Sequence, residues 1–114
     1  MDGHPDDPFF IGRPFQLSLV TELNEKIIIS ALLFFKTDKM KSYREILLKG
    51  NSGLYQYKIN INDFPGNSID YFFAIKTTDG KIYGAPVNDK NILQPIKRTF
   101  IDPVKYYEQK KRLN

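Results

Sequence analysis

The chain has 114 residues, a formal net charge of +4, 41% hydrophobic residues and 26% charged residues. That length suits one domain with a core between two packed layers, and this composition excludes a disordered chain. The sequence contains no Cys, which excludes a disulfide framework, a thiolate nucleophile and a Cys-ligated zinc ion.

The first third of the chain predicts two strands. Residues 1–14 predict a flexible lead-in, in which residues 9–14 form a short edge segment because Pro14 cannot donate to a strand ladder. Residues 15–21 alternate apolar and polar side chains, as a half-buried strand does. Residues 26–36 predict a central strand whose inward face holds Ile27, Ile29, Ala31, Leu33 and Phe35.

The middle of the chain predicts two further strands separated by turns. Residues 42–48 predict a strand, and residues 49–53 predict the loop that follows it. The next strand places Tyr55, Tyr57, Ile59 and Ile61 on its inward face. Residues 62–68 are rich in turn-forming residues and predict a connection.

Residues 69–84 predict a β-hairpin. Alternation places Ile69, Tyr71, Phe73 and Ile75 on one face of its first strand. The pair Asp79-Gly80 predicts a two-residue type I′ turn, because both residues tolerate the positive φ that this turn requires. Pro86 then ends the second strand.

The C-terminal part predicts a short strand over residues 98–101 and a short helix. Asp102 suits the N-cap and Pro103 suits the first helical position, so residues 104–113 are expected to be helical. The favoured interpretation packs Val104 and Tyr107 on the domain and leaves a basic face in water. In the alternative, nucleic acid or an anionic membrane surface contacts the basic residues Lys105, Lys110, Lys111 and Arg112.

Together these elements predict an all-β domain. About seven short antiparallel strands over residues 15–101 form a β-sandwich, between the lead-in of residues 1–14 and the helix or tail of residues 102–114. A small closed barrel of the OB type, which would bind single-stranded nucleic acid on its aromatic side chains, is the alternative.

Five sequence features share an order found in known domains: residues 29–36, 43–48, 54–59 and 69–75, and then the Asp79-Gly80 turn with Pro86. Their order resembles that of the immunoglobulin-like, fibronectin-type-III-like modules that bacteria append to exported and surface proteins. The resemblance covers a little over half of the chain. It implies an immunoglobulin-like sandwich that serves in spacing, docking or protein recognition, with Tyr71 as a buried tyrosine that caps a loop.

Phe34 and Phe72 are the candidate interaction face. Each lies on the opposite phase from the clearer inward face of its strand, so the two rings are expected to look outward. Exposed aromatic side chains of this kind mark interfaces, and a strand edge offers a second route to a protein partner.

The sequence predicts no enzyme, no metal and no cofactor. His4 is the only histidine, so neither a nucleophilic triad nor a multi-His metal site can be assembled within one chain. The aspartates near loops are assigned to turns and caps rather than to calcium: Asp63, Asp70, Asp79 and Asp89. The tyrosine-rich strands are interpreted as core, with glycan binding as the alternative.

The predicted cellular location depends on whether an export signal has been removed. No apolar segment approaches the roughly 20 residues that span a bilayer, and the first residues predict no signal peptide. We expect a periplasmic or cell-surface location if an export signal has been removed, with a cytoplasmic location as the alternative.

Overall fold

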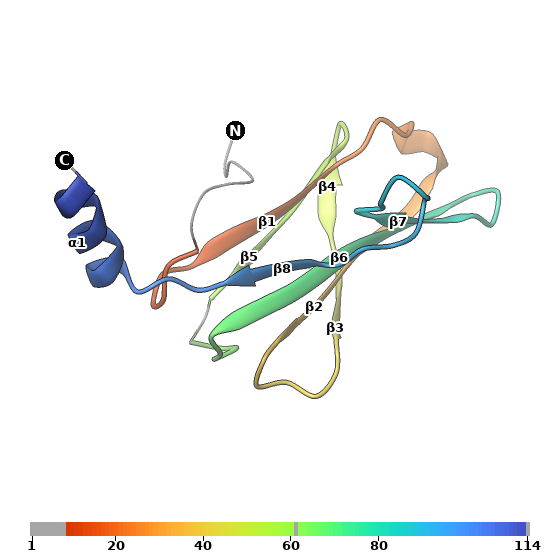
Figure 1. The fold of residues 1–114 in the computed structure, drawn as a ribbon. Coiled ribbons are helices and arrows are strands. Elements are labelled where there is room, and N and C mark those ends of the chain that lie inside the picture. The colour runs from red at the N-terminus through yellow and green to blue at the C-terminus, as the bar shows by residue number, and fades with distance from the viewer. Residues whose placement is uncertain (1–8, 61, 114) are drawn as a thin grey trace.

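Two antiparallel sheets pack against each other across a shared core (Figure 1). The structure is a computed structural model that describes residues 9–60 and 62–113, with the backbone alone at residues 51 and 110–113. The smaller sheet has the strand order β1-β5-β4, formed by Phe15–Val20, Leu54–Ile59 and Lys49–Asn51.

The larger sheet has the order β3-β2-β6-β7, and β8 pairs with β6 beyond the end of β7. Its strands are Arg44–Leu47 (β3), Ile28–Thr37 (β2), Ser68–Thr77 (β6), Ile82–Ala85 (β7) and Ile96–Thr99 (β8). The prediction of an antiparallel all-β architecture is therefore confirmed. The strands of the described residues form two separate sheets, whereas the alternative fold requires one closed barrel.

Alternation in β2 and β6 builds most of the core. The predicted inward residues of β6 are all buried, and so are Ala31, Leu33 and Phe35 of β2. The smaller sheet adds Leu17 and Leu19 from β1 and the following residues from β5: Tyr55 and Ile59. Because each sheet turns its apolar phase toward the other, hydrophobic burial holds the two layers together.

At the start of the central strand β2, the side chains face other directions than predicted. Ile27 and Ile29 were expected to face inward, but their exposed fractions are 38% and 66%. The pairing of β2 with β6 shifts register between Ile28 and Ser30, and this irregularity reverses the phase of the alternation. A short 3-10 helix, Glu25–Ile27, precedes the shift, capped by the side chain of Asn24.

The loop predicted at residues 49–53 is instead a strand and a turn. β3 and β4 follow one another directly and change sheet at Leu48, whose N–H donates to the carbonyl of Ala31 over 2.8 Å. After this point β4 pairs with β5, and the chain turns at Ser52 and Gly53, which both have positive φ.

The hairpin turn between β6 and β7 also differs from the predicted type I′ geometry. Of the pair Asp79-Gly80, only Gly80 has positive φ. The N–H of Gly80 donates to the carbonyl of Thr77, and the N–H of Thr77 donates to the carbonyl of Lys81. This is a three-residue loop in which a tight turn is followed by one glycine in the left-handed region.

The folded part begins earlier than the predicted boundary at residue 15. Phe9 is buried, and Phe10 forms a parallel bridge with Ile101, so residues 9–11 are an edge segment as expected. Residues 1–8 of the predicted lead-in, including His4, lie outside the described residues, as does Ile61.

The predicted C-terminal helix is confirmed as α1, Pro103–Leu113, and Asp102 caps it by accepting the N–H of Val104. It projects from one end of the sandwich (Figure 1). Val104 is 64% exposed and Tyr107 is 53% exposed, so the expected packing of Val104 on the domain is wrong. The helix instead contacts the domain through Phe10, whose ring packs against Tyr106 and Tyr107.

We predict that Asp79 stabilises the hairpin in a pH-dependent way. Its carboxylate accepts hydrogen bonds from the hydroxyl of Thr77 and the N–H of Lys81, and the Thr77 bond is the main cause that holds the pKa of Asp79 below 3.8. A folded-state pKa below the unfolded value gives stability that is present above pH 3.8 and is lost as the pH falls through the folded value.

Asp79→Ala should therefore destabilise the domain at about pH 7 and should cost less at about pH 2.5, as measured by urea unfolding at both pH values. Asp89→Ala is the control, because no described residue donates a hydrogen bond to its carboxylate. A cost for Asp79→Ala that stays the same at both pH values would contradict the assignment.

Candidate functional site

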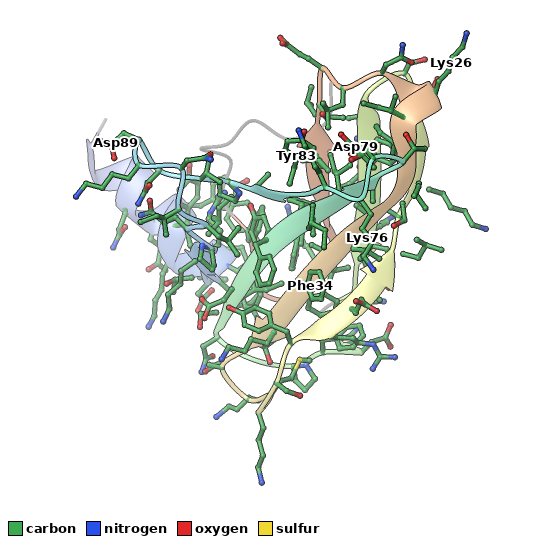
Figure 2. The ribbon with its side chains drawn as sticks, turned by 90° about the vertical axis from the view of Figure 1, so that its right-hand side faces the viewer. Lys26, Phe34, Lys76, Asp79, Tyr83 and Asp89 are labelled. Carbon is green, nitrogen blue, oxygen red and sulfur yellow. The ribbon has the colours of Figure 1, made fainter. Side chains whose placement is uncertain are left out.

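Phe34 and Phe72, the predicted interaction residues, lie directly opposite each other in the β2–β6 register. Their rings stack with centroids 4.8 Å apart and an interplanar angle of 9°. Tyr43 adds its ring edge-on to Phe72 at 5.1 Å. Figure 2 shows Phe34 on the face of the larger sheet that points away from the smaller sheet, with Lys76 on the same face.

This surface is apolar around the rings. Leu32 lies beside Leu47 on β3 and beside Ala74 on β6, and Leu47 is 64% exposed. We call the set formed by Leu32, Phe34, Tyr43, Leu47, Phe72 and Ala74 the outer aromatic face. Phe34 and Phe72 are each half-buried rather than fully exposed, because each ring covers one side of the other.

Charged residues border the outer aromatic face at one end. In the strand register, Asp70 lies opposite Lys36 on β2 and opposite Lys97 on β8. The ammonium group of Lys36 lies 5.0 Å from the centroid of the Tyr43 ring. The Oδ1 atom of Asp70 is buried and accepts no hydrogen bond from the described residues. Asp70 therefore lies within a strand and serves neither as a turn residue nor as a cap, contrary to the assignment from sequence.

This environment shifts the pKa of the Tyr43 hydroxyl. Its partial burial raises the pKa of Tyr43 above 10.0, and the negative charge of Asp70 raises it further. Tyr71, on the inward face, is also shifted: burial raises its pKa, and the hydrogen-bonded Arg98 side chain opposes that change. The hydroxyl of Tyr71 thus contacts a side chain on the neighbouring strand β8.

Lys105, the one predicted basic contact residue whose side chain is described, is not brought to the outer aromatic face. Lys105 is exposed on α1, which projects from the end of the sandwich (Figure 1). The side chains of Lys110, Lys111 and Arg112 lie outside the described part of the chain. The two predicted contact regions are therefore carried by different elements.

Sequence reasoning missed a cleft of about 530 Å³ that opens where β3 and β4 part from β2. Its floor consists of Ala31, Leu48 and Tyr55, which are all buried. Gly50 is needed beside Tyr55, since a Cβ there would lie 2.8 Å from the tyrosine ring and 2.2 Å from the carbonyl oxygen of Leu54. The sequence signal was the Lys49–Gly53 segment, but it was interpreted as a loop because two glycines and a serine are typical of one.

No protein-family model matches the chain, and no curated protein matches its sequence. No group of three or more His, Cys, Asp or Glu side chains that could hold a metal ion occurs within residues 9–60 and 62–113. Over the same residues, no helix is long and apolar enough to cross a membrane.

We predict that Asp70→Asn lowers the pKa of Tyr43 toward 10.0, because it removes the negative charge that disfavours ionisation of the phenol. The pKa should stay above 10.0, since burial is the larger cause of the shift and is retained. A titration followed by NMR of the tyrosine ζ carbons measures this, with Asp63→Asn as a control at an exposed site. An unchanged or higher Tyr43 pKa in Asp70→Asn would contradict the arrangement.

Proposed function

We propose that this domain is a non-enzymatic interaction module that binds a protein partner through the outer aromatic face. The observation that carries the proposal is the stacked pair Phe34 and Phe72 on the side of the larger sheet that no described strand covers. The solvent side of a two-layer sandwich is ordinarily lined by polar residues. Three aromatic rings and Leu47 on that side favour a surface that is covered in the working protein.

The composition of this surface suits protein recognition. Interfaces combine an apolar centre, enriched in aromatic residues, with a polar rim. Here the rings form the centre, and Lys36, Glu45 and Lys76 lie beside them on the same phase of their strands. Flat rings that are already stacked lose little conformational freedom on binding, which favours affinity.

The strand order supports an immunoglobulin-like identity for the module. Such sandwiches place strands B, E and D in one sheet and strands C, F and G in the other. Assigning β1, β5 and β4 to B, E and D, and β2, β6 and β7 with β8 to C, F and G, reproduces that order. We also propose that the domain belongs to a bacterial envelope or surface protein, and the resemblance of residues 29–86 to modules of bacterial exported proteins supports this.

Nucleic-acid and glycan binding have less support. Base or sugar stacking needs open ring faces, and Phe34 and Phe72 use one face each on the other.

Photo-crosslinking tests the proposal directly. With benzoylphenylalanine at position 34 or 72, the domain, produced in its own cells, should form adducts with one recurring protein, identified by mass spectrometry. The same group at position 107, on the exposed Tyr107 of α1, is the matched control and should not give that adduct. No adduct at 34 and 72, or the same adducts at all three positions, would contradict the proposal.

Phe34→Ser with Phe72→Ser should then abolish capture of the crosslinked protein while the far-UV circular dichroism stays that of the wild type. Truncating a central aromatic anchor weakens an interface by about 2 kcal/mol or more, which is at least about thirtyfold in affinity. Tyr107→Ser serves as the control. Undiminished capture by the double variant would count against the outer aromatic face.

A further inference from the structure

The cleft beside β2 is bounded by two strand edges. Ile28 and Ser30 pair with β6 on one side, whereas β3 pairs with β2 only from Leu32 onward and the N–H of Leu48 donates to the carbonyl of Ala31. On the facing wall, β4 pairs with β5, and no described strand pairs with its other edge. Unpaired strand edges offer backbone N–H and C=O groups to an added strand.

The floor and rim of the cleft differ in character. The buried side chains of Ala31, Leu48 and Tyr55 make the floor apolar, and the change of sheet at Leu48 leaves the cleft between β2 and β4. Ile29 at the rim is 66% exposed. The cleft is broadly open to solvent, so it suits an extended chain rather than an enclosed small ligand.

The lining carries two lysines and one glutamate, so its formal charge is net positive. Lys26 and Lys49 are exposed, and neither forms an ion pair within residues 9–60 and 62–113. Figure 2 shows Lys26 at the end of the molecule where β2 begins. The one acidic side chain of the lining, Glu25, already accepts the N–H of Ser52 over 2.8 Å.

We propose that this cleft binds an extended peptide segment of a protein partner, which adds as a new strand beside Ile28–Ser30 and alternates apolar with acidic side chains. The apolar phase lies on Ala31, Leu48 and Tyr55, and the acidic phase meets Lys26 and Lys49. This peptide site is a second site besides the outer aromatic face, and it is tested independently of that face.

The edge of β1 that no described strand pairs with serves as an internal comparison. β1 is the other outer strand of the smaller sheet, and its residues, Phe15–Val20, include no charged side chain. Strand addition driven by backbone groups alone would use β1 as readily as β2. The cleft and its two lysines are what single out the β2 edge.

The test uses three eight-residue synthetic peptides with the wild-type domain. One alternates valine with glutamate, one alternates valine with lysine, and one is the acidic peptide with two central valines replaced by proline, which cannot complete a strand ladder. Binding is measured by fluorescence polarisation, and the contacted amides are located by ¹⁵N NMR shifts. The acidic peptide should bind, should shift residues 28–31 and 48–50, and should weaken as salt rises.

Matched variants sharpen the test. Ile29→Glu places a negative charge at the cleft, and Lys26→Glu with Lys49→Glu reverses the rim; each should weaken the acidic peptide by about tenfold or more. Val20→Glu, at a residue of similar exposure (70%) on β1, should leave binding unchanged.

Several outcomes would overturn the proposal: no binding of the acidic peptide at millimolar concentration, equal binding of the basic or proline-containing peptide, or shifts confined to β1. Self-association through the β2 edge in place of peptide binding, detected by sedimentation, would also overturn it. None of these results bears on the outer aromatic face, since the crosslinking result at positions 34 and 72 stands separately.

Discussion

The pairing of β2 with β6 is the constraint on which the rest of this structure depends. These two ten-residue strands lie side by side at the centre of the larger sheet, and each supplies a buried phase to the core. The register that brings Leu33 beside Phe73 on the inside also brings Phe34 beside Phe72 on the outside. Because side chains alternate strictly, a slip of one residue would expose the core and bury the outer aromatic face.

The change of sheet at Leu48 has an equally wide effect. It joins the two layers along one side, since β3 belongs to the larger sheet and β4 to the smaller. It also leaves the first part of β2 with a partner on one edge only. β3 therefore covers the edge of β2 near Phe34 but leaves it uncovered before Leu32, and the cleft lies there beside Ala31. Both proposed contact surfaces follow from where β3 and β4 lie relative to β2.

The alternation of apolar and polar residues in the sequence predicted several strands and the side of the sheet that their residues face. It identified β1, β5 and β6, the inward tyrosines of β5 and β6, and the outward phase of Phe72. The alternation gave wrong predictions where an extra residue in a strand, or pairing with a distant segment, determines which way the side chains face or whether a strand forms. The register shift after Ile28 lies in the pairing of β2 with β6, so the sequence of β2 alone predicted the wrong side for Ile29.

The same limit explains the other differences. Lys49–Asn51 becomes a strand because β5 pairs with it, although Gly50 weakens any local preference for strand. Phe10 lies ninety-one residues before Ile101, and no local pattern could show that the two pair or that α1 packs its tyrosines on Phe10. The stacking of Phe34 on Phe72 could be anticipated only as a shared outward phase, because their alignment needs the strand register.

A double-mutant cycle between Phe34 and Phe72 measures the central interaction most directly. Unfolding free energies of the wild type, Phe34→Ala, Phe72→Ala and the double variant isolate the coupling between the two rings. The β2–β6 register predicts a favourable coupling of about 0.5–1.5 kcal/mol, the usual value for a stacked aromatic pair. Strictly additive effects would contradict that register and the outer aromatic face built on it.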